Sequence, residues 1–227
     1  MSAAPAQART WKDLLLDGVI SEDTAERIAR LQAALIAASW GSPVWRQNLG
    51  DLTVFDQLRL DPYYRATARR HPDLASFFDT LIDDARRRAI ALTHGDWSPK
   101  NFLVDGASVM AIDFEVIHFG DPSFDAAFLL NHLLLKSFHR PEWIAAYTRA
   151  AARFWETLIS ALPPDADWFS ASTIAHLGGL MLARIDGKSP VEYLRGEHVR
   201  DRVRRFAREL ILRRPASVEE VLMRVQA

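Results

Sequence analysis

The stretch that decides the fold and the candidate chemistry is "ALTHGDWSPKNFLVDGASVMAIDFE", residues 91–115. Its runs "FLV" and "SVMAID" are short and of β type, and Asp105 and Gly106 stand between them. An Asp-Gly pair suits the positive φ values of a tight turn, so the pattern predicts a β-hairpin. Polar side chains crowd the segments before and after this hairpin, which makes the stretch the candidate site.

The composition is that of an ordinary globular protein, with 227 residues of which 49% are hydrophobic. The 28 basic and 29 acidic residues nearly balance, so no overall field draws the chain to nucleic acid or to an anionic membrane. The absence of cysteine excludes disulfides, thiolate metal sites and cysteine nucleophiles. No apolar run has the length of a signal peptide or a membrane span, so we expect a cytoplasmic protein.

Before the hairpin the apolar residues recur at helical spacing. Ser21 and Gly41 are suited to begin and end an amphipathic helix. Asp61 and Pro62 have the pattern of an N-cap and a first helical residue, which predicts a second helix from this point. A third helix is predicted to run to about residue 90.

After the hairpin, residues 121–139, "DPSFDAAFLLNHLLLKSFH", are nearly all apolar and begin with a second Asp-Pro pair. This pattern predicts a long buried helix at the centre of the core. Further helices are predicted over residues 141–161, 168–184, 197–213 and 218–226. The fold class expected is therefore mainly α with a small β-hairpin, an α+β protein.

The polar residues around the hairpin have the spacing of a phosphotransferase catalytic loop. Asp96 and Asn101 lie five residues apart, and Asp113 ends the second predicted strand. An Asp beside a substrate hydroxyl can accept its proton, while Asn and Asp oxygens can hold the Mg²⁺ that neutralises phosphate charge. The hairpin turn brings its second strand back beside the loop that precedes the first, so these side chains are expected on one rigid edge.

Three motifs in order, "HGDWSPKNFLV", "IDFE" and "GDPSFDAA", resemble those of the aminoglycoside phosphotransferase and choline kinase family, relatives of the protein kinases. The resemblance implies an ATP-dependent enzyme that uses Mg²⁺. It implies that Asp96 is the catalytic base, that Asn101 and Asp113 are magnesium ligands, and that His94 and Asp125 support the catalytic loop. Aminoglycosides, choline-like alcohols, amino-acid alcohols and sugars all fit as the small-molecule hydroxyl substrate.

The resemblance also implies a domain organisation. Residues 21–227 resemble the helical C-terminal lobe of such a kinase, with the catalytic loop and metal-binding hairpin at residues 91–125, and residues 1–20 are expected to form a flexible N-terminal tail. The family's β-rich N-terminal lobe carries a glycine-rich loop and a phosphate-binding lysine. The first 93 residues contain three dispersed glycines and a single lysine, Lys12, so we expect an upstream segment or a partner chain to supply that lobe.

Two other functions are compatible with these residues. A non-catalytic binding module would keep the helical lobe to hold a small molecule or a partner protein. A metal-dependent hydrolase would use His94, Asp96, Asp113 and His118 around a metal. The hydrolase leaves Asn101 unexplained, and the phosphotransferase explains all three motifs.

Several neighbouring residues have a structural interpretation beside a functional one. Trp97 is expected to pack, and Lys100 to be solvated. Glu115, Asp121 and Asp125 could form an acidic mouth for a cationic substrate, but the last two also suit the start of the following helix, which is the interpretation we favour. The arginines from residue 195 to residue 214 alternate with acidic residues and predict a solvated helix face.

Overall fold

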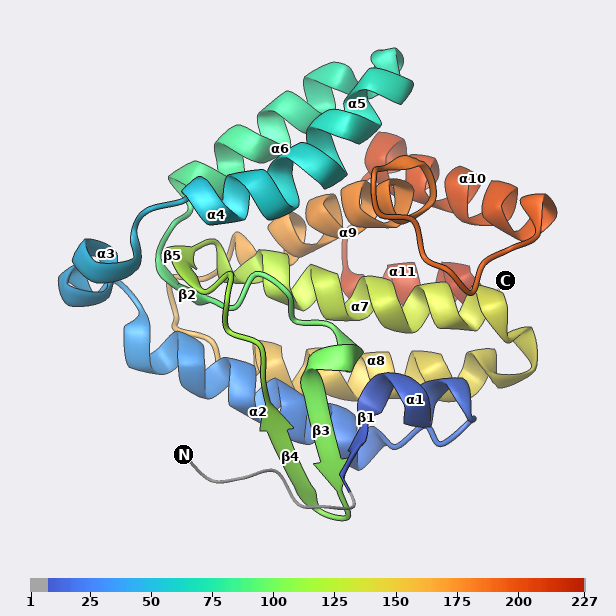
Figure 1. Ribbon diagram of the computed structural model, residues 1–227, viewed down its shortest axis with the longest axis horizontal. Coiled ribbons are helices and arrows are strands. Elements are labelled where there is room, and N and C mark those ends of the chain that lie inside the picture. Colours follow the sequence, from blue (N-terminus) through green and yellow to red (C-terminus); the bar gives the residue numbers. More distant parts are fainter. Residues whose placement is uncertain (1–7, 227) are drawn as a thin grey trace.

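The computed structural model describes residues 8–226, and most of them are helical (Figure 1). The helices are α1 (Trp11–Leu16), α2 (Glu22–Ser39), α3 (Pro43–Leu49), α4 (Thr53–Phe55), α5 (Ala66–Arg70), α6 (Ala75–Arg87), α7 (Pro122–His139), α8 (Ile144–Ile159), α9 (Phe169–Asp186), α10 (Glu197–Arg213) and α11 (Val218–Gln226). A π-helix, η1 (Asp56–Arg65), and three 3-10 turns, η2 (Pro72–Leu74), η3 (Pro99–Asn101) and η4 (Pro141–Trp143), complete the helical part. The prediction of a mainly α protein with a small β component is confirmed.

Helix α7 lies at the centre of the fold, packed against α8 and α9, as Figure 1 shows. Of its 18 residues, 17 are buried. Each large apolar side chain removed from water in this way contributes about 1.5–3 kcal/mol to folding, so this helix is the most firmly held element of the core. Asp121 caps it as predicted, accepting a hydrogen bond from the Ser123 N–H at 2.9 Å.

The strands form two small antiparallel sheets. The predicted hairpin consists of β3 (Phe102–Asp105) and β4 (Ser108–Ala111), and β1 (Arg9–Thr10) pairs with the outer side of β3. Asp105 pairs with Ser108, so the turn consists of Gly106 and Ala107, and Gly106 has a φ of 55°, which favours glycine. The second sheet pairs β2 (Ala91–Thr93) with β5 (His118–Gly120) antiparallel, so the segment after β2 lies beside the segment that leads into β5.

The predicted flexible tail over residues 1–20 is wrong for the residues that the structure describes, and residues 1–7 lie outside them. β1 and α1 occupy this segment, and Trp11 and Leu15 are fully buried. The Trp11 ring meets Phe102 edge to face, with 6.3 Å between ring centroids. The segment is ordered because it adds a strand to β3 and two large apolar side chains to the core.

The prediction that Asp61 and Pro62 begin a helix is also wrong. The helical turns begin at Thr53 and continue through η1, with Pro62 inside the π-helix. Proline lacks the N–H that an α-helix would use here, and the wider π-helical turn accommodates a backbone without that donor. The Asp61 carboxylate instead pairs with Lys188 at 2.6 Å.

The remaining helices follow the predicted order, with ends that shift by a few residues. The arginines of α10 pair mostly with neighbouring carboxylates, for example Arg204 with Asp186 and Arg213 with Glu209, as a solvated helix face requires. Within residues 8–226, none of the helices combines the length and apolar character needed to cross a bilayer.

We predict that Trp11→Ala lowers the free energy of unfolding by about 3–5 kcal/mol, the usual effect of removing a fully buried indole. Urea denaturation of the two proteins measures this difference. Val19→Ala, at a side chain that is about half exposed, should change it by less than about 0.5 kcal/mol. Equal effects of the two substitutions would contradict the packed position of residues 9–16.

Candidate active site

The predicted catalytic loop, residues 94–101, connects β2 to β3 and turns sharply at Gly95. Gly95 has a φ of 78°, and a Cβ atom there would lie 2.9 Å from the Val116 carbonyl oxygen. Only glycine avoids both the strained backbone and the clash. The loop can therefore pass close to the segment that leads into β5.

Asp125 joins this loop to the central helix. One carboxylate oxygen accepts a hydrogen bond from the His94 N–H at 2.6 Å, and the other accepts one from the Gly95 N–H at 2.9 Å. The side chain is buried, and this burial raises the pKa of Asp125 to about 7 against the opposing effect of the two N–H donors. The predicted supporting residue thus contacts the loop at the two residues that precede Asp96.

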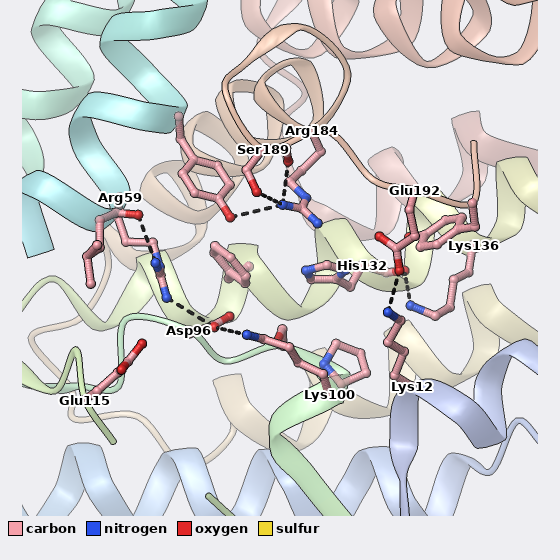
Figure 2. Close-up of a pocket in the computed structure, with 16 residues that line it drawn as sticks. Lys12, Arg59, Asp96, Lys100, Glu115, His132, Lys136, Arg184, Ser189 and Glu192 are labelled. Carbon is pink, nitrogen blue, oxygen red and sulfur yellow. Dashed lines mark hydrogen bonds and ion pairs between the residues drawn. The ribbon is translucent and has the colours of Figure 1, made fainter. Parts of the chain in front are cut away.

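Asp96 lies at the wall of a cavity and is held between two cations (Figure 2). One of its carboxylate oxygens lies 3.1 Å from Arg59 and 2.9 Å from Lys100. Burial works against the charged form, but Arg59 and Lys100 outweigh it and lower the pKa of Asp96 below its ordinary value. Asp96 is therefore a carboxylate at neutral pH. Lys100, expected to be only solvated, is half exposed and takes part in this cluster.

A backbone hydrogen bond beside the loop holds Asn101 next to the segment that carries Asp113. The Asn101 side-chain amide donates to the Asp96 carbonyl oxygen at 2.9 Å, and the Ile112 N–H donates to the Asn101 carbonyl oxygen at 3.0 Å. Asp113 follows directly, with an exposed side chain and a φ of 68°. Such a φ is uncommon outside glycine and is found where a site determines the backbone.

His94 and Trp97 pack beneath the loop. His94 is fully buried, and its Nε2 is 3.0 Å from the Ile112 carbonyl oxygen. Burial lowers the pKa of His94, so the ring is neutral at neutral pH and donates this hydrogen bond. Trp97 meets the rings of His94 and Phe102 edge to face. Both residues shape the loop from inside the core.

The side-chain oxygens of Asn101 and Asp113 suit a magnesium ion whose other ligands are phosphate and water better than a metal bound by protein side chains alone. Within the described part of the chain, no group of three or more His, Cys, Asp and Glu side chains could hold a metal. His118, one of the residues considered for a metal-dependent hydrolase, is buried and stacks on Phe55 with 4.1 Å between ring centroids. Mg²⁺ commonly uses one or two protein oxygens and completes its shell with water and phosphates, as Asn101 and Asp113 could provide.

The cavity beside Asp96 has a volume of about 300 Å³. The sequence interpretation missed most of the side chains that line it: Lys12, Arg59, Tyr63, His132, Lys136, Arg184, Ser189, Glu192 and Tyr193. They come from α1, η1, α7, α9 and the segment after α9, so no local spacing connects them. The one available signal was a lysine inside the apolar run of α7.

Asp121 and Asp125 do not form an acidic mouth. Asp121 is buried beneath the helix start, where its carboxylate also lies 3.4 Å from His176 Nε2, and His176 Nδ1 is 2.7 Å from the Tyr64 hydroxyl. Both carboxylates are used within the protein, as their structural interpretation required. Of the three acidic residues considered for that role, only Glu115 lines the cavity.

The sequence model of the phosphotransferase enzyme family matches residues 6–169. This match covers more than half of the chain, so the protein belongs to the phosphotransferase enzyme family. None of the curated proteins matches the chain. The family resemblance inferred from the three motifs is confirmed.

We predict that Asp125→Ala destabilises the protein more than Asp96→Ala. Asp125→Ala leaves the His94 and Gly95 N–H groups buried without acceptors, at about 1–3 kcal/mol for each. Water from the cavity can replace the carboxylate of Asp96, so that substitution should lower the melting temperature less. Thermal unfolding of both variants decides the order, and Asp125→Asn, which keeps one acceptor oxygen, should fall between Asp125→Ala and wild type.

Proposed function

We propose that the protein transfers the γ-phosphoryl group of ATP to a hydroxyl of a small molecule, with Asp96 as the catalytic base. On this proposal, residues 21–227 correspond to the helical C-terminal lobe of a protein-kinase-like phosphotransferase. The observation that carries the proposal is the position of the Asp96 carboxylate, which lines the cavity in a loop held by Asp125. Membership of the phosphotransferase family supports the same reaction class.

The chemistry follows from where Asp96 is held. A substrate hydroxyl in the cavity donates a hydrogen bond to Asp96, which orients its oxygen toward the γ-phosphorus. A new phosphorus–oxygen bond forms, the bond to the β,γ-bridging oxygen breaks, and ADP leaves with that electron pair. The hydroxyl proton passes to Asp96. In a loose transition state the proton moves late, so a base of lowered pKa positioned by Arg59 and Lys100 is adequate.

Asn101 and Asp113 are the residues that would hold magnesium. When bound, Mg²⁺ neutralises charge on the nucleotide phosphates. Asn101 is oriented for this role because its side-chain Nδ2 donates a hydrogen bond to the Asp96 carbonyl oxygen. Its side-chain Oδ1 is then the atom that could bind the ion. Asp113 has no ion-pair partner among the described residues.

We expect this chain alone to bind magnesium and ATP weakly, with a dissociation constant well above micromolar. The site described here supplies the metal side, whereas the glycine-rich loop and phosphate-binding lysine belong to a lobe that an upstream segment or a partner chain would provide. Titration calorimetry with and without Mg²⁺ measures the affinity. A micromolar constant for the 227 residues would contradict this expectation.

The catalytic assignment is tested once such a lobe is supplied and turnover is detected. Asp96→Asn keeps the size and removes the proton acceptor, so phosphoryl transfer should fall by about two to four orders of magnitude, with nucleotide affinity nearly unchanged. Asp113→Asn should weaken Mg²⁺-dependent nucleotide binding as well as turnover, because it removes a charge from the metal site. Near-normal turnover of Asp96→Asn would overturn the assignment.

A non-catalytic binding module is the second candidate. The observation that favours it is the cavity, which is lined by this chain's own residues and requires no nucleotide to exist. The two functions differ in one measurement, since a binding module would hold a small molecule in the cavity and show no phosphoryl transfer after the nucleotide-binding lobe is supplied.

A further inference from the structure

The cavity beside Asp96 carries more positive than negative side chains. Five cations line it, against three carboxylates: Lys12, Arg59, Lys100, Lys136 and Arg184, and Asp96, Glu115 and Glu192. Figure 2 places Arg59 and Lys100 on either side of Asp96, with Arg184, Lys136 and Lys12 around the other part of the cavity. The side chains therefore divide into a catalytic end and a basic end.

Three of the five cations are paired within the protein. Arg59 and Lys100 share Asp96, and Lys12 lies 2.5 Å from Glu192. Among the described residues, Lys136 and Arg184 have no carboxylate within 4.0 Å. The excess of charge is therefore located at two named side chains on the basic end.

Lys136 is a buried lysine at the basic end of the cavity. It lies on α7 and is 1% exposed, and its ammonium group makes a single long hydrogen bond of 3.5 Å to the His132 carbonyl oxygen. Burial lowers the pKa of Lys136 to about 7, with Lys12 and Arg184 adding to the effect and Glu192 opposing it. A buried amine without an acceptor destabilises the fold, so a ligand that supplies the acceptor accounts for its presence.

Donors also dominate the side chains around Lys136. One terminal nitrogen of Arg184 donates to Ser189 and to the Tyr63 hydroxyl, at 2.6 and 3.1 Å, while its Nε is buried without a hydrogen-bond partner. The Tyr193 hydroxyl is likewise buried without one. Lysine and arginine have no acceptor to offer, so these groups together match a ligand rich in acceptor oxygens.

We propose that the phosphoryl acceptor is a hydroxy compound with an anionic group, a carboxylate or a phosphate, bound by Lys136 and Arg184 while its hydroxyl faces Asp96. This inference rests on the proposed function for the hydroxyl and on the cavity alone for the anion. A cationic acceptor would meet the Arg184 guanidinium and the Lys136 amine, neither of which has a carboxylate within 4.0 Å, whereas an anion would favour the ammonium form of Lys136. A volume of about 300 Å³ is at the small end for ligand sites, which indicates a small acceptor.

A matched set of alcohols tests the charge directly in the absence of nucleotide. Glycerate carries a carboxylate, glycerol 3-phosphate carries a phosphate, glycerol is neutral and choline is cationic. Calorimetric titration of the full chain should give saturable binding of glycerate or glycerol 3-phosphate and none of glycerol or choline. The tighter of the two anions identifies which oxyanion the site accepts.

Two variants and one control locate the binding. Lys136→Met and Arg184→Met should each weaken binding of the anion about 10- to 100-fold, the effect of losing a charge-assisted hydrogen bond. Arg205→Met removes one positive charge at an exposed position of α10 and should leave the affinity unchanged. Lys136→Met should also raise the melting temperature without ligand, which separates lost binding from lost folding.

Proton uptake gives an independent readout of the same contact. At pH 8 the free Lys136 amine is mostly neutral, and a bound anion favours its ammonium form. Binding should therefore take up a proton, and the measured enthalpy should depend on the ionisation enthalpy of the buffer. Lys136→Met should abolish this dependence, whereas Arg205→Met should keep it.

The proposal is overturned if glycerol or choline binds as well as the anions, if neither anion binds up to about 10 mM, or if the Lys136 and Arg184 variants bind like wild type. Failure of the catalytic proposal gives a different result. In that case the anion still binds and depends on Lys136, but Asp96→Asn has no effect on turnover or no turnover exists. The two proposals can therefore fail separately.

Discussion

Two hydrogen bonds from the backbone N–H groups of His94 and Gly95 to the Asp125 carboxylate join the catalytic loop to the central helix. That helix is fixed by apolar burial along nearly its whole length, so the loop is held by the most stable part of the core. The same two hydrogen bonds also help to position two further side chains. Arg59 donates to the Gly95 carbonyl oxygen and Asn101 to that of Asp96, so both are positioned by a backbone that Asp125 has already fixed.

Three of the polar residues of α7, Asp125, His132 and Lys136, lie on one face of the helix together with Phe128. Asp125, Phe128, His132 and Lys136 are separated by three, four and four residues, which is the spacing of neighbours along a helix face. Eleven residues span ~16 Å at ~1.5 Å per residue, so this face reaches from the catalytic loop to the basic end of the cavity. One helix thus carries the carboxylate that holds the loop and an amine that lines the cavity.

Much of the fold could be predicted because its signals are local. An Asp-Gly turn between two β-type runs, and an Asp-Pro pair before a long apolar run, each determine their own element. The failures have non-local causes. Residues 9–16 are ordered by pairing with β3, and Trp11 by packing on Phe102, which no pattern within the segment indicates. The Asp61-Pro62 pair has the signature of a helix start, but helical turns that begin earlier continue through it in π-helical form.

The residues of the candidate site also divide into those with a local sequence signal and those that come together only in the folded chain. The residues proposed to act on phosphate lie in one short stretch, and their spacing alone predicts that role. Residues that would select the acceptor come from five separate elements and only meet in the folded chain, with Lys136 in the apolar α7 run as their single trace in the sequence. Because Asp96 already pairs with Arg59 and Lys100, and Glu192 with Lys12, the basic side chains of the cavity that have no carboxylate within 4.0 Å among the described residues are Lys136 and Arg184. The negative charge of a ligand is therefore favoured at the end of the cavity away from the catalytic loop, while its reacting hydroxyl is drawn to the carboxylate at the other end.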